Sequence, residues 1–168
     1  MKAHPICVTF LSVLSLAIGL VAPASAKDFK VPDTKPVISV TYPDSWKPEE
    51  IDAGVQGQTA DTAVYLSVEA SKSEKGMKEI IDGTFDMFKE HKVDIDKDSK
   101  KVNKMEIAGQ PAEEMLFTGK DEDGPTVISI TIFTVKDTVI VISYWASTES
   151  EAKYHAAIVK IITSIKPL

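Results

Sequence analysis

Three aspartates, Asp94, Asp96 and Asp98, recur at every second position of the chain. On a β-strand this spacing would place three carboxylates on one face. Carboxylate oxygens are the ligands that calcium and manganese prefer. A calcium loop of the helix–loop–helix kind needs a glycine at its sixth position and a glutamate at its twelfth. Counted from Asp94, this chain has Ser99 and Met105 there.

A half-exposed strand explains the same three aspartates without a metal, because Val93 and Ile95 would then point inward and the acids into water. The acidic run Asp121–Asp123 similarly indicates a solvated hairpin turn. We therefore expect no metal site and no cofactor, although Asp94, Asp96 and Asp98 are the residues that would form a metal site if one existed.

Two histidines, His91 and His155, are the other side chains that could do acid–base chemistry. His91 lies at the predicted end of one helix, where a cation complements the helix dipole. His155 flanks the apolar face of another helix. Neither belongs to a metal-ligand spacing, and the chain has no G-x-S-x-G motif. We expect no catalytic residues and no enzymatic activity; a hydrolase with a site assembled from distant residues is the least favoured alternative.

Three aromatic residues, Tyr42, Trp46 and Trp145, could form a surface on which a ligand stacks. All three fall at predicted strand ends, where aromatic side chains usually pack in the core. We favour the core interpretation.

The first 26 residues have the pattern of a secretory signal peptide. Lys2 supplies a positive start, Ile6–Val21 an apolar run, and Ala24–Ala26 a small-residue cleavage site. The apolar run is shorter than the roughly 20 residues that a membrane-spanning helix needs. We expect cleavage between Ala26 and Lys27, a periplasmic or secreted product, and no stable membrane insertion after cleavage.

The expected mature chain, residues 27–168, has the length of one domain of 142 residues. The one cysteine, Cys7, lies in the leader, so the mature chain has no thiol chemistry. It carries 18 lysines, no arginine and 25 acidic residues, a formal charge of −7. This balance argues against nucleic acid, whose binding depends on clustered cations. The lack of arginine also removes the usual bidentate clamp for phosphate.

Two apolar strands, Thr126–Val135 and Thr138–Ala146, are joined by a tight Lys136-Asp137 turn and are the centre of the predicted fold. Both are apolar on both faces, which predicts positions in the middle of a sheet covered on each side. A helix follows, and Thr148 with Glu151 has the spacing of a capping box.

The remaining elements are assigned from periodicity. Residues 27–36 are expected to be an extended lead-in. The predicted strands are Val37–Tyr42, Ile51–Val55, Thr62–Ala70, Val93–Asp98, Val102–Ile107 and Ala112–Thr118. The other helix is predicted over Met77–His91.

The two helices are expected to pack through Phe85 with Phe88 and through Ile158 with Ile162, and truncating Phe85 or Ile162 to alanine should cost roughly 2–5 kcal/mol. The short connections predict an α+β fold with a six- or seven-stranded, mainly antiparallel sheet and helices on both faces, an α/β/α sandwich.

Several short motifs, in this order, resemble the PsbP-like fold family. They are the strand and turn of residues 39–46 (SVTYPDSW), the turn of residues 108–112 (AGQPA) leading to Gly119, the aromatic strand end at Tyr144, and the closing residues 164–166. The family includes an extrinsic subunit of photosystem II, a Ran-binding nuclear-import factor and small exported bacterial proteins, which this chain resembles most. The resemblance implies an antiparallel sheet between helices and no shared catalytic residues.

The sequence therefore favours a non-enzymatic accessory protein of the cell envelope that engages a protein partner. The alternative is a small-ligand or metal-binding module with a pocket between sheet and helix. A deep apolar pocket with converging polar groups would favour that alternative.

Overall fold

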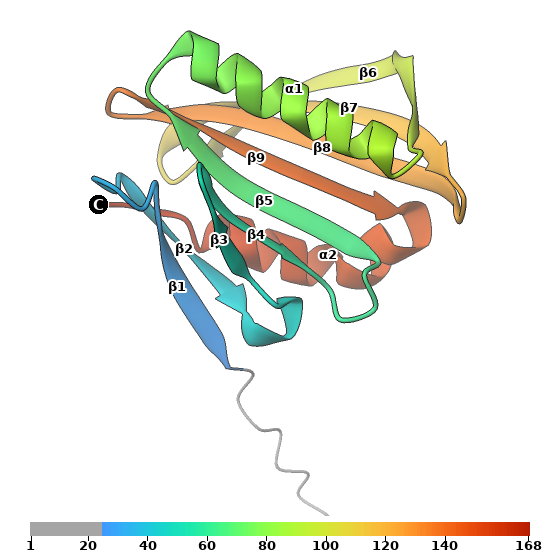
Figure 1. Ribbon diagram of the computed structural model, residues 1–168, viewed down its shortest axis with the longest axis horizontal. Coiled ribbons are helices and arrows are strands. Elements are labelled where there is room, and N and C mark those ends of the chain that lie inside the picture. Colours follow the sequence, from blue (N-terminus) through green and yellow to red (C-terminus); the bar gives the residue numbers. More distant parts are fainter. Residues whose placement is uncertain (1–24) are drawn as a thin grey trace, which may run out of the picture.

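The computed structural model of the protein describes residues 25–168. The predicted leader, with Cys7, lies outside the described residues except for Ser25 and Ala26. The main sheet has seven antiparallel strands in the order β3-β4-β5-β9-β8-β7-β6 (Figure 1). Its strands are β3 (Glu49–Ile51), β4 (Gly54–Gln58), β5 (Val64–Ser71), β6 (Asp94–Ile107), β7 (Gln110–Asp121), β8 (Gly124–Val135) and β9 (Thr138–Ser147).

The predicted central pair of strands is confirmed. β8 and β9 lie inside the sheet and pair from Thr126↔Ser147 to Val135↔Thr138. The Lys136-Asp137 turn joins them. Ile128 and Ile130 of β8 and Ile140 of β9 are fully buried, as expected for strands covered on both faces.

The two helices, α1 (Glu74–Glu90) and α2 (Thr148–Thr163), cover opposite faces of this sheet (Figure 1). Thr84 of α1 faces Ser143 of β9, with 3.5 Å between the two hydroxyl oxygens. Ile158 of α2 packs in a cluster that contains Ile142, the residue before Ser143. Successive strand residues point to opposite faces, so the α/β/α sandwich is confirmed.

A second, smaller sheet was not predicted. It has the order β1-β2-β10 and consists of β1 (Ala26–Val31), β2 (Ile38–Pro43) and β10 (Lys166–Pro167). Residues 27–36 were expected only to be an extended lead-in. β1 pairs with β2 because Phe29 and Val31 are buried in the core on the α2 side, a contact that the polar, proline-containing local sequence does not reveal.

The strand predicted over Ile51–Val55 is wrong, because the chain turns there and forms a hairpin of β3 and β4. A Cβ atom at Gly54 would lie 2.1 Å from the carbonyl oxygen of Val68. Only glycine therefore permits β4 to approach β5 this closely.

Two strands predicted separately, over residues 93–98 and 102–107, form the single strand β6. Its register with β7 shifts between Asp96 and Lys101, as at a β-bulge. This irregularity lies between the two segments that the sequence pattern predicted as separate strands.

α1 begins at Glu74, before the predicted Met77, and α2 begins at Thr148 but with a different N-cap from the one predicted. The N-cap of α1 is Ser73, whose side chain accepts a hydrogen bond of 3.0 Å from the Gly76 N–H. The N-cap of α2 is Ser147, which accepts from the Ser150 N–H at 3.1 Å. The capping box predicted from Thr148 is therefore wrong by one residue.

Most of the core lies between the sheet, α2 and the small sheet. A second cluster lies under α1 and contains Phe88, Phe117 and Ile128, with Phe85 packed against it. Both predicted pairs, Phe85 with Phe88 and Ile158 with Ile162, pack on the sheet. Phe85 and Ile162 are only partly buried, however, while Phe88 and Ile161 are 0% exposed. Phe88 and Ile161 therefore fill more of the core than Phe85 and Ile162 do. No helix within residues 25–168 has the length and apolar composition to cross a membrane.

Candidate ligand-binding pocket

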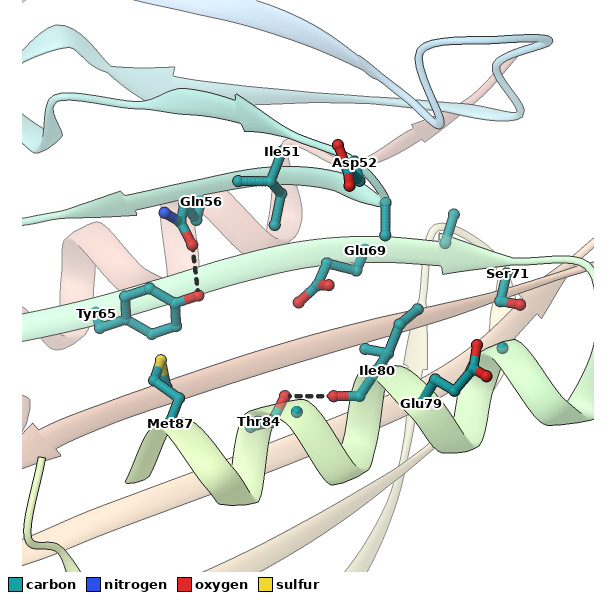
Figure 2. A pocket seen from close by; sticks show the side chains of 14 residues that line it. Ile51, Asp52, Gln56, Tyr65, Glu69, Ser71, Glu79, Ile80, Thr84 and Met87 are labelled. Atoms are coloured by element: carbon teal, nitrogen blue, oxygen red, sulfur yellow. Dashed lines mark hydrogen bonds between the residues drawn. The ribbon is translucent and has the colours of Figure 1, made fainter. Parts of the chain in front are cut away.

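A pocket of about 660 Å³ lies between α1 and the β3–β5 part of the sheet (Figure 2). We call it the α1 pocket. Its volume is within the roughly 300–1,000 Å³ range of small-molecule sites. Its lining comes from the β3–β4 turn, from Gln56 of β4, from Tyr65 and Glu69 of β5, and from one side of α1.

A glycine of α1 leaves part of this space open. On the helix, Gly83 lines the pocket, and a Cβ atom there would meet nothing within 4 Å. The helix thus places no side chain at this position of the pocket.

Glu69 is the half-buried charged side chain inside the α1 pocket, and it points into the space between β5 and α1 (Figure 2). The Ser67 hydroxyl donates a hydrogen bond of 3.0 Å to its Oε1 atom. Within residues 25–168, Glu69 forms no salt bridge. Burial raises the pKa of the Glu69 carboxyl, and the Ser67 hydrogen bond offsets this only in part.

Tyr65 and Gln56 form a polar pair beside Glu69. The Tyr65 hydroxyl donates to Gln56 Oε1 at 2.9 Å, and Gln56 Nε2 donates to Glu49 Oε1 at 2.6 Å. Burial raises the pKa of Tyr65 to about 12. The phenol therefore keeps its proton at neutral pH and acts as a hydrogen-bonding group.

Apolar side chains from Ile51, Ile80 and Met87 supply the remaining inner surface (Figure 2). Asp52 and Glu79 are exposed at its edge, and Glu79 pairs with Lys75 at 3.2 Å. The α1 pocket thus combines an apolar wall with a few polar groups, the composition of a binding site for a small molecule.

The predicted metal candidates lie elsewhere, on β6. Asp94, Asp96 and Asp98 are all exposed, and the Asp98 N–H donates to Asp96 Oδ1 at 3.0 Å. The register shift after Asp96 interrupts the alternation that would have aligned the three carboxylates. Across residues 25–168, no cluster of three or more His, Cys, Asp or Glu side chains has the geometry to hold a metal ion. That the chain binds no metal stays a prediction.

The two histidines are far apart in the fold, and both are exposed. His91 is the C-cap residue of α1, and its ring lies 5.1 Å from that of Trp145. His155 Nδ1 lies 2.8 Å from Glu151 Oε1 on α2. Neither histidine lines the α1 pocket.

The aromatic residues do not form one stacking surface. Tyr42 and Trp46 are buried in the core on the α2 side, whereas Trp145 packs against Phe88 under α1. The core interpretation therefore applies to Tyr42 and Trp46. Trp145 is half-buried, and its ring N–H lies 3.3 Å from Asp121 Oδ2.

A second cavity, which we call the α2 groove, has a volume of about 490 Å³ and lies between α2 and the end of the β6–β7 hairpin. Ile107, Ile158 and Ile162 contribute to its apolar lining. Met105 and Val159, at its edge, are 39% and 42% exposed.

Sequence reasoning missed Glu69, Tyr65 and Gln56 as site residues. One signal was present: β5 alternates apolar Val64, Leu66 and Val68 with polar residues, although a helix covers each face of the sheet. A polar strand face under a helix indicates either hydrated space or a buried polar network.

Comparison with known proteins gives structural matches at low sequence identity. The solution structure of cyanobacterial PsbP (CyanoP) from Synechocystis sp. PCC 6803 has a TM-score of 0.56 and 14% identity, over 92% of this chain and 99% of that chain. A crystal structure from Bacteroides thetaiotaomicron VPI-5482 has a TM-score of 0.50 and 15% identity, over 78% of this chain but only 45% of that one.

The Saccharomyces cerevisiae Ran-binding protein Mog1p has a TM-score of 0.47 and 12% identity, over 84% of this chain and 95% of that chain. No family model and no curated protein matches the sequence. At such low identity these likenesses concern the fold alone. The PsbP-like fold expected from the sequence motifs is confirmed.

Proposed function

We propose that this chain is an exported, non-enzymatic binding protein that holds a small organic molecule in the α1 pocket. The single observation that carries the proposal is the Glu69 carboxylate, which faces an open space of about 660 Å³ and has one hydrogen-bond donor, Ser67. This is the alternative that the sequence left open, a module with a pocket between sheet and helix.

The arrangement is unfavourable for the empty protein. Burying a carboxylate without a cation costs free energy, and the space beside it forfeits packing contacts. A bound molecule would offset both costs by filling the space and donating to Glu69. Groups with perturbed pKa values in a cleft are candidates for functional sites for the same reason.

Binding without catalysis agrees with the groups that line the α1 pocket. Covalent catalysis needs a nucleophile next to a base. Tyr65 keeps its proton because its pKa is about 12, and both histidines lie outside the pocket. Replacing His91 and His155 together by alanine should leave ligand binding and the melting temperature unchanged. Lost binding in a variant that melts normally would argue for histidine chemistry.

Export to the periplasm or the cell exterior is proposed from the N-terminal residue pattern, with residues 1–26 as the signal peptide and residues 27–168 as the mature domain. A role as an accessory protein of the cell envelope follows from this location.

Gly83 provides a direct test. Gly83→Trp would place a large side chain at the open pocket, whereas Gly83→Ala adds one methyl group where nothing lies within 4 Å. Each purified protein is incubated with a small-molecule extract of cell envelopes, and retained compounds are identified by mass spectrometry. The wild type and Gly83→Ala should retain a compound that Gly83→Trp does not. Retention of the same compounds by all three, or of none by any, would overturn the proposal.

A protein partner is the second candidate function, and the α2 groove favours it. Met105 and Val159 expose apolar surface at its edge, and an apolar side chain of a partner would fit between them. Val159→Glu should abolish capture of such a partner. Val102→Glu is the control, since Val102 is 53% exposed but does not line the groove. Equal capture by both variants would exclude the groove as the docking site.

A further inference from the structure

We infer that the ligand of the α1 pocket is an organic cation, an ammonium or guanidinium group attached to an apolar body. This inference rests on the proposed function and adds the chemical class of the ligand.

The first reason is that the side-chain hydroxyl donors around the α1 pocket are already used within the protein. The hydroxyl of Tyr65 donates to Gln56, that of Thr84 to the Ile80 carbonyl oxygen at 3.0 Å, and that of Ser71 to the Ser73 carbonyl oxygen at 3.1 Å. Figure 2 shows the first two of these bonds, one from β5 to β4 and one along α1.

The amide of Gln56 is partly committed, because one N–H of its Nε2 donates to Glu49 and its Oε1 accepts from Tyr65, which leaves one N–H of the amide. The side-chain groups left to face a ligand are therefore mainly acceptors, namely the phenol oxygen of Tyr65 and the carboxylate of Glu69. A ligand that fits this pocket has to supply donors.

The second reason is the unfilled capacity of Glu69. An ionised carboxylate has about four lone-pair sites, and Ser67 occupies one of them with its 3.0 Å hydrogen bond. No lysine within residues 25–168 forms a salt bridge with Glu69. A ligand ammonium would supply both the missing charge and the missing donors, and charge-assisted hydrogen bonds are the stronger kind.

The third reason is the shape and charge of the rest of the pocket. Ile51, Ile80 and Met87 give the ligand body an apolar surface. Asp52 at the edge disfavours an anionic ligand by charge repulsion. Glu79, also at the edge, pairs with Lys75, which does not line the pocket.

Three probes of matched size separate this inference from the proposed function, namely 2-phenylethylamine, 2-phenylethanol and phenylacetate. Each probe is titrated into the protein at neutral pH, and binding is followed by calorimetry and by NMR of the Met87 methyl group. The amine should bind more tightly than the alcohol, and phenylacetate should not bind. Glu69→Gln should weaken amine binding at least about tenfold, the usual size of a hydrogen bond to a charged partner.

Glu74→Gln is the matched control, because it removes the same charge from an exposed residue of α1 that does not line the pocket. It should leave amine binding within about twofold of wild type, as expected for a screened surface charge. All variants are first compared by thermal melting.

Equal binding of amine and alcohol, or full amine binding by Glu69→Gln, would overturn the cation inference and leave the pocket intact. The proposed function itself is wrong if two results occur together. None of the probes shifts the NMR signal of the Met87 methyl group, and the wild type retains no compound from the envelope extract beyond those that Gly83→Trp also retains.

Discussion

Glu69 lies on β5 opposite Gly54 of β4 and Val141 of β9, so its carboxylate leaves the middle of the sheet towards α1. The carboxyl is half-buried beside the α1 pocket, and this desolvation raises its pKa. The hydroxyl of Ser67 donates one hydrogen bond to the Glu69 carboxylate. The same side chain thus reduces stability as a buried charge and provides the main acceptor of the candidate site.

The raised pKa gives a pH prediction with a definite sign. The native state holds the Glu69 proton more tightly than the unfolded state, whose carboxyl has the ordinary value of 4.5. The contribution of Glu69 to stability is therefore fully present below 4.5 and falls as the pH rises through the higher native pKa. Glu69→Gln removes the titrating carboxyl group, and the glutamine side chain still offers an oxygen that accepts the hydrogen bond from Ser67.

The free energy of unfolding of Glu69→Gln, relative to wild type, should therefore increase as the pH rises above 4.5. Urea denaturation at a series of pH values measures this difference. A difference that stays constant with pH would show that the Glu69 pKa is the same in both states.

At the scale of single elements, α2 begins where Ser147 caps it, although Thr148 with Glu151 is the better sequence match to a capping box. The strand β9 continues to Ser147 and pairs it with Thr126 of β8. This pairing fixes Ser147 in extended backbone, the conformation an N-cap needs. Thr148 instead donates a hydrogen bond of 3.2 Å to the carbonyl oxygen of Pro125.

Ser147→Ala should destabilise the protein by about 1 kcal/mol, the usual cost of losing an N-cap. Thr148→Ala should cost less, because its exposed hydrogen bond is replaced by water. Thermal or urea denaturation of the two variants gives the comparison. A larger loss for Thr148→Ala would place the cap at the residue the sequence suggested.

Helix phase is a second property of the elements, and paired truncations measure it. Phe88 and Ile161 are 0% exposed, while Phe85 and Ile162 are partly buried. Phe88→Ala should cost about 3–5 kcal/mol and Ile161→Ala about 2–5 kcal/mol. Phe85→Ala and Ile162→Ala should each cost less than their neighbours, because they fill less of the core. The opposite order in either pair, measured by urea denaturation, would mean that the helix is rotated from the structure described.

At the scale of the whole molecule, the two ends of the described chain meet in the small sheet. β2 pairs with β1 on one side and with β10, the last strand, on the other. The Thr41 N–H also donates to the Ser164 hydroxyl at 2.8 Å. Together with α2, this sheet covers one face of the large sheet, while α1 covers the other (Figure 1).

Cleavage after Ala26 would leave this assembly intact, because the pairs from Lys27↔Tyr42 to Val31↔Ile38 remain. N-terminal sequencing of the exported protein should therefore begin at Lys27, and the product should be folded. A product that starts elsewhere, or that keeps the leader in the membrane, would contradict the predicted processing.

The sequence by itself determined the parts of the fold that depend on neighbouring residues. Apolar residues on both faces of residues 126–135 and 138–146 placed this hairpin in the middle of the sheet, and motifs in order gave the PsbP-like fold. Features that depend on contacts between distant segments were missed, such as the pairing of β1 with β2 and the division of β3 from β4 at Gly54.

The candidate site belongs to the second group. Gln56, Glu69 and Gly83 come from three separate elements of the sequence. Only the tertiary structure brings them to one space under α1, because a pocket is the volume that several elements together fail to fill. Glu69 becomes significant for the same reason. It is an ordinary polar residue of a strand until the tertiary structure covers that face with a helix and half-buries its carboxylate.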